Sequence, residues 1–492
     1  MRIRRMGVAL GGGYLVLAVA GIPAAWAVTP VPAPVFPAAA ARTGRVQRLS
    51  FVAGVIRALK GSPAAARAAA RVREAQSAIT QIRGYRLPRL VAGVTGMRTN
   101  NALNVFGSKL QQRRASFNDF GFAEFNPNNP AIEPRALNYP GVYDNFNTRL
   151  TLQIPLWEGG RLTAMAAAAR DGLAAARAGD RAARQQLIFR LLQAYEGVRA
   201  ARAFVRVAIQ GEKAAAAYAG ISRQMYARGI VVKSNLLTAQ VHLGDARLRV
   251  AAARNAAARA LEVFHIVMGE PADARLDVGA EFLPPMPRIS LTELHREALA
   301  ANPAFRAIQA RRAMRAAGVS QAGAAYWPRI NLALMANWNR ETPGLGARSY
   351  TAVANLSWQL FDLGARRGAV GRALAVEDQA RAEQRAFRER LIHRLDNAYR
   401  NAFLAQQQIT VRTLAVRQAG EAERILAARY GRGITTLATL LAGQARLDKV
   451  RADLVQAHYR LAVARAAIWL SIGRLNLAQV QHWAGISSKG EQ

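Results

Sequence analysis

The chain has 492 residues, no cysteine, and 68 basic against 30 acidic side chains, which gives a formal net charge of +38. The lack of cysteine excludes a disulfide framework and a thiolate metal site. A strongly basic chain suggests nucleic acid or anionic lipid as a partner. The arginines, however, are spread along helical patterns instead of clustering with aromatic residues, and we expect no nucleic-acid partner.

The N-terminus has the pattern of an export signal. Three arginines within residues 2–5 precede an apolar stretch over 6–22, and Ala25-Trp26-Ala27 supplies a small-x-small cleavage pattern. We expect a signal peptide over residues 1–27, followed by a Pro/Ala-rich segment over 28–45. A retained membrane anchor is the alternative, which the shortness of the apolar stretch disfavours.

The rest of the chain follows one plan twice. Two proline pairs are 240 residues apart (303 − 63 and 328 − 88), whereas Tyr226 and Tyr430 are 204 apart (430 − 226). The first copy therefore carries 36 extra residues (240 − 204). The predicted divisions are repeat 1 (46–273), a linker (274–290), repeat 2 (291–475) and a C-terminal tail (476–492).

Each repeat contains helical patterns on both sides of two alternating segments. Apolar Ile330, Leu332 and Leu334 alternate with polar Asn331, a period that predicts a strand. The expected elements of repeat 1 are a helix over 46–86 broken near residues 61–63, strands over 89–99 and 146–157 with a long loop over 100–145, and helices over 160–226 and 234–268. Those of repeat 2 are a helix over 291–326, strands over 329–340 and 350–361, and helices over 364–430 and 438–472.

The helices over 160–226 and 364–430 are unusually long and contain no proline. At about 1.5 Å per residue, each would reach roughly 100 Å. A return helix and the short helix of the other repeat together match the length of one long helix. We therefore expect two shorter helices to stack end to end beside each long one.

The strands match a membrane span in length. About ten residues per strand suffice to cross an apolar layer of roughly 25–30 Å when the strand is tilted. Trp327, Trp338, Tyr350 and Trp358 lie at or near strand ends, where interfacial rings are expected. A soluble sheet packed on helices is the alternative. Four strands cannot close a barrel, so several chains would pool their strands, and three would supply twelve.

No constellation of catalytic residues is present. The six histidines are far apart in the sequence, without the spacing of a metal site. We expect no enzyme activity, no cofactor and no bound metal.

The order of elements resembles that of the TolC-like outer-membrane efflux proteins, the outer membrane factors. The most specific matches are the strand-to-helix junctions at 155–161 and 360–366, which are similar to the family pattern P-L-F-D-x-G-R. The turns Tyr226-Ala227-Arg228-Gly229 and Tyr430-Gly431-Arg432-Gly433 also match. The similarity covers nearly the whole chain after the export signal.

The resemblance implies a mainly α-helical chain with four transmembrane strands. Three chains would form a 12-stranded β-barrel in the outer membrane of a Gram-negative bacterium, continued by a long α-helical barrel in the periplasm. The implied function is a passive conduit in a tripartite efflux or type I secretion system. The implied partners are a periplasmic adaptor (membrane fusion) protein, an inner-membrane transporter of the RND, ABC or MFS type, and outer-membrane lipid. The alternative is an exported helical scaffold or adhesin without channel activity.

The resemblance also implies two kinds of site residue. Adaptor docking falls on the two turns, and the periplasmic gate lies just beyond them. At the gate the family commonly has acidic residues, but this chain has none there, so we expect a pore with weak cation preference or with anion preference. We also expect the Tyr430 hydroxyl to hydrogen-bond Asn235. The docking residues are Gly229, Ile230, Val231, Val232, Gly433, Ile434, Thr435 and Thr436, and the gate residues are Tyr430, Asn235, Thr439 and Ala442.

Overall fold

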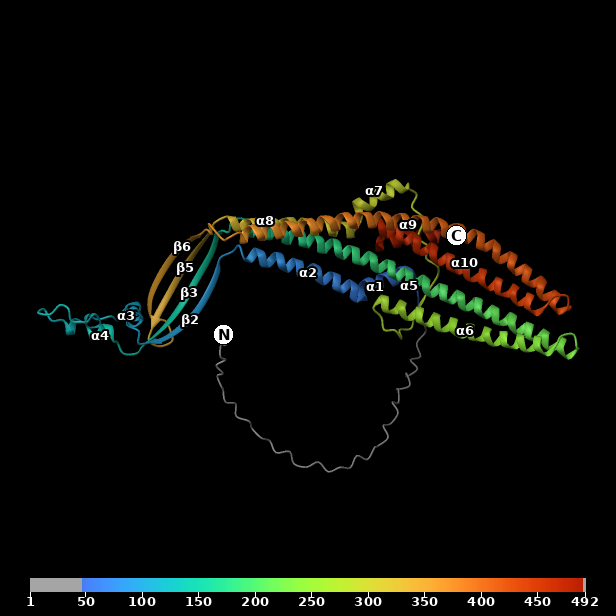
Figure 1. Ribbon diagram of the computed structural model, residues 1–492, viewed down its shortest axis with the longest axis horizontal. Coiled ribbons are helices and arrows are strands. Elements are labelled where there is room, and N and C mark those ends of the chain that lie inside the picture. Colours follow the sequence, from blue (N-terminus) through green and yellow to red (C-terminus); the bar gives the residue numbers. More distant parts are fainter. Residues whose placement is uncertain (1–46, 490–492) are drawn as a thin grey trace, which may run out of the picture. The chain divides into compact units, whose positions relative to one another are not determined.

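The computed structural model describes residues 47–489. The predicted signal peptide (1–27) and the segment 28–45 lie outside the described residues. The longest elements are two helices of 67 residues each, α5 (Arg161–Ala227) and α9 (Ala365–Gly431), which run side by side with shorter helices (Figure 1). Within the described residues, no helix combines the length and the apolar composition needed to cross a bilayer.

Four antiparallel strands form a sheet in the order β2-β3-β5-β6. The outer strands β2 and β6 pair with no further described strand, so both edges of the sheet expose unpaired backbone groups. The strands are β2 (Arg89–Thr99), β3 (Tyr143–Trp157), β5 (Arg329–Arg340) and β6 (Ala347–Ser357).

The register gives this sheet one apolar and one polar face. Leu90, Leu152, Leu334 and Ala352 lie directly opposite one another across the four strands and therefore share a face. On the other face, the Arg149 guanidinium donates to the Asn337 side chain at 2.9 Å. Leu90 is 62% exposed, so the apolar face is uncovered in a single chain.

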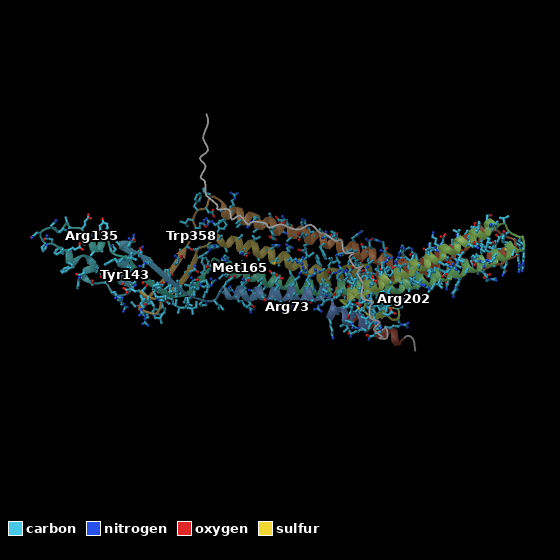
Figure 2. The ribbon with its side chains drawn as sticks, turned by 90° about the horizontal axis from the view of Figure 1, so that it is seen from below. Arg73, Arg135, Tyr143, Met165, Arg202 and Trp358 are labelled. Atoms are coloured by element: carbon cyan, nitrogen blue, oxygen red, sulfur yellow. The ribbon has the colours of Figure 1, made fainter. Side chains whose placement is uncertain are left out.

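The passage from β6 into α9 is fixed by one ion pair. The Asp362 carboxylate accepts hydrogen bonds from the backbone N–H of Gly364 (3.2 Å) and Arg366 (3.0 Å), and it pairs with the Arg366 side chain at 2.6 Å. Arg366 also donates to the carbonyls of Gln359 and Leu360. Gly364 adopts φ +93°, which explains the glycine of this junction. In Figure 2, Trp358 lies where the strands meet the helices.

The helices pack in one curved layer beside α5 and α9. Helices α2 (Pro63–Gly84) and α6 (Lys233–Met268) pack on one flank of α5, and α8 (Pro303–Gly323) and α10 (Leu437–Ser471) lie between α5 and α9. Each long helix therefore lies beside two shorter helices, as predicted from the lengths of the helices.

The predicted partners in this stacking were wrong, because each short helix meets the return helix of its own repeat. The Asn302 side chain, which caps α8, donates to the carbonyl of Ser471 at the end of α10 at 2.8 Å. In the first repeat, Gly269 closes α6 so near Gly61 that an added Cβ would lie 2.5 Å from its carbonyl oxygen. In each repeat the return helix (α6 or α10) runs in the same direction as the short helix (α2 or α8). The C-terminus of the return helix therefore reaches the N-terminus of the short helix.

A second layer covers one face of the helices near their middle. Most of its elements pack around Leu191 and Tyr195 of α5, both fully buried, whereas the helix over 291–301 packs on α9 through Leu294 and Leu391. A parallel strand pair joins Gln47 to Leu276 in this layer. The elements are β1 (Gln47–Leu49), α1 (Phe51–Gly61), β4 (Leu276–Val278), α7 (Leu291–Ala301) and α11 (Leu477–Lys489).

Several segments differ from the sequence-based expectation. The last strand ends at Ser357 rather than 361, because the chain there turns toward the Asp362 junction. The loop over 100–145 contains short helices, capped by the side chains of Asn101, Asp119 and Glu124. The linker contains β4, and the tail forms α11. The further short elements are α3 (Ala102–Gln111), η1 (Phe117–Phe120), η2 (Phe122–Glu124), α4 (Arg135–Asn138) and η3 (Ala324–Tyr326).

Candidate docking tips and gate

The two helical hairpins end in turns of the same construction, which we call tip 1 (228–232) and tip 2 (432–436). Gly229 has φ +71° and Gly433 has φ +76°, values that favour glycine. In tip 1 the Ile230 N–H donates to the carbonyl five residues back, at Met225, and in tip 2 the Ile434 N–H donates to the carbonyl of Arg429. These bonds satisfy carbonyls that the helix ends leave free.

The tips expose an apolar surface. Ile230, Val232 and Ile434 are 57%, 65% and 66% exposed. Tip 1 and tip 2 also approach each other, because a Cβ on Gly433 would lie 3.8 Å from Ile230. The two tips therefore lie next to each other, and their exposed apolar side chains come from both repeats.

Each tip hairpin is also strongly basic. Residues 213–244 contain four basic side chains and no acidic one, and residues 424–447 contain another four basic side chains and no acidic one. A protein that docks on the tips would contact apolar side chains that are surrounded by basic side chains.

The predicted hydrogen bond between Tyr430 and Asn235 was wrong. The Tyr430 hydroxyl instead lies 2.7 Å from the hydroxyl of Ser222 on α5. Tyr430 is 1% exposed and packs in a cluster with Met225 and Leu440, which turns its ring toward α5 rather than toward the start of α6.

The other predicted gate residues carry no charge. Thr439 and Ala442 are exposed on α10, and Asn235 is half-buried on α6. The Thr436 hydroxyl accepts the Thr439 N–H at 3.2 Å and so caps α10. The four gate positions are thus close to the tips, but only Tyr430 joins two long helices.

A buried polar network above the tips is absent from the sequence-based predictions. The Tyr218 hydroxyl on α5 hydrogen-bonds the carboxylate of Glu423 on α9 and lies 3.2 Å from the side-chain oxygen of Gln444 on α10. Gln444 in turn donates to Asp448 at 2.8 Å. Burial raises the pKa of Asp448, and burial together with Glu423 raises the pKa of Tyr218. The sequence signal that points to Gln444 is its position 204 residues after Gln240, the spacing of the repeat.

Among the described residues, no group of three or more His, Cys, Asp or Glu side chains is arranged to hold an ion.

Comparison with known proteins identifies the family. Residues 55–269 and 294–474 match the outer membrane efflux protein family. Protein CyaE of Bordetella pertussis is 32% identical over 194 residues, which cover 38% of this chain and 40% of CyaE. That match spans only about two fifths of the relative.

Solved structures share the fold. The CmeC outer membrane channel of Campylobacter jejuni superposes with a TM-score of 0.73 at 16% identity, covering 86% of this chain and 85% of CmeC. The outer-membrane channel OprN gives a TM-score of 0.72 at 20% identity, covering 86% and 89%. The predicted mainly helical chain with a small sheet and the predicted outer-membrane location agree with these matches. The chain belongs to the outer membrane efflux protein family.

Proposed function

We propose that three copies of this chain form a passive conduit across the outer membrane and the periplasm, which docks through its tips on a periplasmic adaptor protein and an inner-membrane transporter. The observation that carries the proposal is a four-stranded sheet with two open edges that continues directly into helices of 67 residues. The exported scaffold or adhesin is the competing function.

The sheet supports the pooling of strands. An open edge exposes backbone N–H and C=O groups that lipid cannot satisfy, so a membrane sheet must close. Pairing of β2 with β6 of a neighbouring copy would satisfy both edges, and three copies would give twelve strands. The apolar face with Leu90 and Leu334 would then meet lipid, and the face with Arg149 would meet water.

The helices support the same assembly. Among the described elements, helix α9 contacts α7, α8 and α10, and it leaves Val411 and Leu414 exposed. At the opposite side of the chain, α6 exposes Val241 and Leu248. Joining the two flanks between copies would bury these side chains, at a gain of about 25 cal/mol per Å² of apolar area.

The tips support docking. Ile230, Val232 and Ile434 are apolar, exposed and next to one another, and such a patch rimmed by charge is typical of an interaction site. The basic surround favours an adaptor with acidic side chains near its apolar contact. Salt should therefore weaken the docking.

Conductance tests the conduit. The purified chain, inserted in a planar lipid bilayer, should give discrete current steps, whereas a scaffold or adhesin should give none. Heat-denatured protein at the same detergent concentration is the control for leaks caused by detergent.

Substitution at the tips tests docking separately. Ile230→Asp and Ile434→Asp should weaken capture of the cognate adaptor at least tenfold, since each places a carboxylate in an apolar contact. Leu345→Asp is the matched control, because Leu345 is 67% exposed in the turn between β5 and β6, outside both tips. Equal loss in all three variants would contradict docking at the tips.

A further inference from the structure

A long groove runs along one face of the helical layer. Two hollows of about 700 and about 950 Å³ share four lining residues, Ala182, Gln186, Ala304 and Phe387, and so form one depression, which we call the α5–α9 groove. Its walls come from α2, α5, α8, α9 and α10. Met165 on α5 is one of its lining residues (Figure 2).

The groove is basic. Its lining has six arginines and two acidic residues, a net charge of +4. One acid, Asp180, is already paired with Arg184 at 2.9 Å, whereas none of the six arginines forms an ion pair with a described carboxylate. The second acid is Glu74. The six are Arg67, Arg71, Arg190, Arg311, Arg394 and Arg460.

The floor of the groove is apolar and holds an unused polar atom. Alanines of α2, α5 and α8 line most of it, together with Ile308, Met314 and Phe387. Gln185 is only 8% exposed; its side-chain N–H donates to the Gly473 carbonyl at 2.6 Å, but its side-chain oxygen has no hydrogen-bond partner. A buried acceptor without a partner is costly, and a ligand that donates to it would remove this cost.

Two contacts position the Arg394 side chain in the wall of the groove. Its guanidinium lies 5.4 Å from the centre of the Phe387 ring, and its Nε donates to the Arg390 carbonyl at 3.2 Å. Burial and the neighbouring Arg390 lower the pKa of Arg394. An incoming anion would pair with this guanidinium, which forms no ion pair with a described carboxylate.

The groove opens away from the second layer of the fold. On α5, Gln186 lines the groove while Ile188 belongs to the core beneath α1. Two residues along a helix correspond to a rotation of about 200°, so these side chains point in opposite directions. In the proposed conduit the second layer must lie outside, since it would otherwise fill the passage. The groove then faces the passage.

We propose that the α5–α9 groove binds amphipathic anions: small molecules with an apolar body, an acidic group for the unpaired arginines, and a hydroxyl or amide N–H for Gln185. The apolar floor holds the body of the ligand, and Arg394 and Arg460 hold its acidic group. This inference rests on the proposed function, because only a conduit brings solutes to this face. The site would enrich such solutes inside the passage.

Equilibrium dialysis tests the groove without requiring conduction. The full chain in a neutral sugar-based detergent is dialysed against 6-hydroxynaphthalene-2-sulfonate and against a hydroxynaphthalene with a quaternary ammonium group, with empty micelles as reference. The sulfonate should be retained and the cation should not. Arg394→Gln and Arg460→Gln should each weaken sulfonate binding about tenfold, the effect expected for losing a charge-assisted hydrogen bond.

The matched control is Arg385→Gln. It removes the same charge from α9, but Arg385 is exposed and does not line the groove. Its sulfonate binding should stay within twofold of that of the unaltered chain. Equal retention of both probes, or equal loss in all three variants, would overturn the inference. A chain that conducts without retaining the sulfonate overturns only this site, whereas retention without conductance overturns the conduit and leaves a binding site.

Discussion

The hydroxyl groups of Tyr430 and Ser222 lie 2.7 Å apart between α9 and α5, and both side chains are buried. This contact ties the two long helices together one turn above the tips. In the proposed conduit, the helices must separate at this end for the passage to open.

Removal of this hydrogen bond should loosen the closed end. Tyr430→Phe and Ser222→Ala should each lower the free energy of unfolding by about 1 kcal/mol and raise the resting conductance in a bilayer. Tyr226→Phe is the matched control, since Tyr226 is the repeat equivalent of Tyr430 but is 42% exposed. An equal rise of the conductance in Tyr226→Phe would contradict the proposal that the Tyr430–Ser222 hydrogen bond holds this end of the passage closed.

Asp448 should make stability depend on pH. Burial raises its pKa above the ordinary 3.8, so the folded chain holds this proton more tightly than the unfolded chain. The free energy of unfolding contributed by Asp448 therefore falls as pH rises from about 3.8 to the raised pKa, and is constant above it. Asp448→Asn should remove that fall, as measured by thermal midpoints from acidic to neutral pH.

The control for Asp448 is Glu383→Gln, at an exposed position of α9 outside the polar network. Its pH profile should match that of the unaltered chain. Identical profiles for Asp448→Asn and the unaltered chain would exclude a role for the Asp448 proton.

Gly433 should resist substitution because of its backbone. At φ +76° an alanine is strained by about 1–2 kcal/mol, so Gly433→Ala should increase hydrogen exchange of the amides in tip 2. Gly431→Ala, two residues away, has no atom within 4 Å of the added Cβ and no left-handed backbone, and should leave exchange unchanged or slower. Faster exchange in Gly431→Ala than in Gly433→Ala would show that the turn does not depend on the backbone conformation of Gly433.

Tyr195 should anchor the second layer. Its buried hydroxyl donates to the Ala280 carbonyl at 2.8 Å, and burial raises its pKa to about 12. Tyr195→Phe should lower the free energy of unfolding by about 1–2 kcal/mol, because that carbonyl loses its partner. Tyr399→Phe, at the equivalent position of repeat 2 and only half-buried, should cost much less in the same thermal unfolding experiment.

The sequence predicted those parts of the fold that depend on local pattern. Alternation located the strands to within a few residues, and the absence of proline with the glycines of the tips gave the length of α5 and α9. The helices inside the loop over 100–145 were missed because the side chains of Asn101, Asp119 and Glu124 stabilise them through caps, without a long apolar period.

Contacts between helices could not be predicted in the same way. The repeat makes Tyr226 and Tyr430 equivalent in sequence, yet Tyr226 is exposed and Tyr430 is buried. Only Tyr430 lies on the flank that meets another long helix. The Tyr218 network and the groove arginines likewise depend on which faces of α5, α9 and α10 meet, a property of the packing.

The mass of the native complex tests the central claim most directly. Native mass spectrometry of the purified chain in detergent should give three copies, since three are needed to supply twelve strands and to pair every β2 edge with a β6 edge. A stable monomer or dimer, with the edges of the sheet still open, would contradict the account.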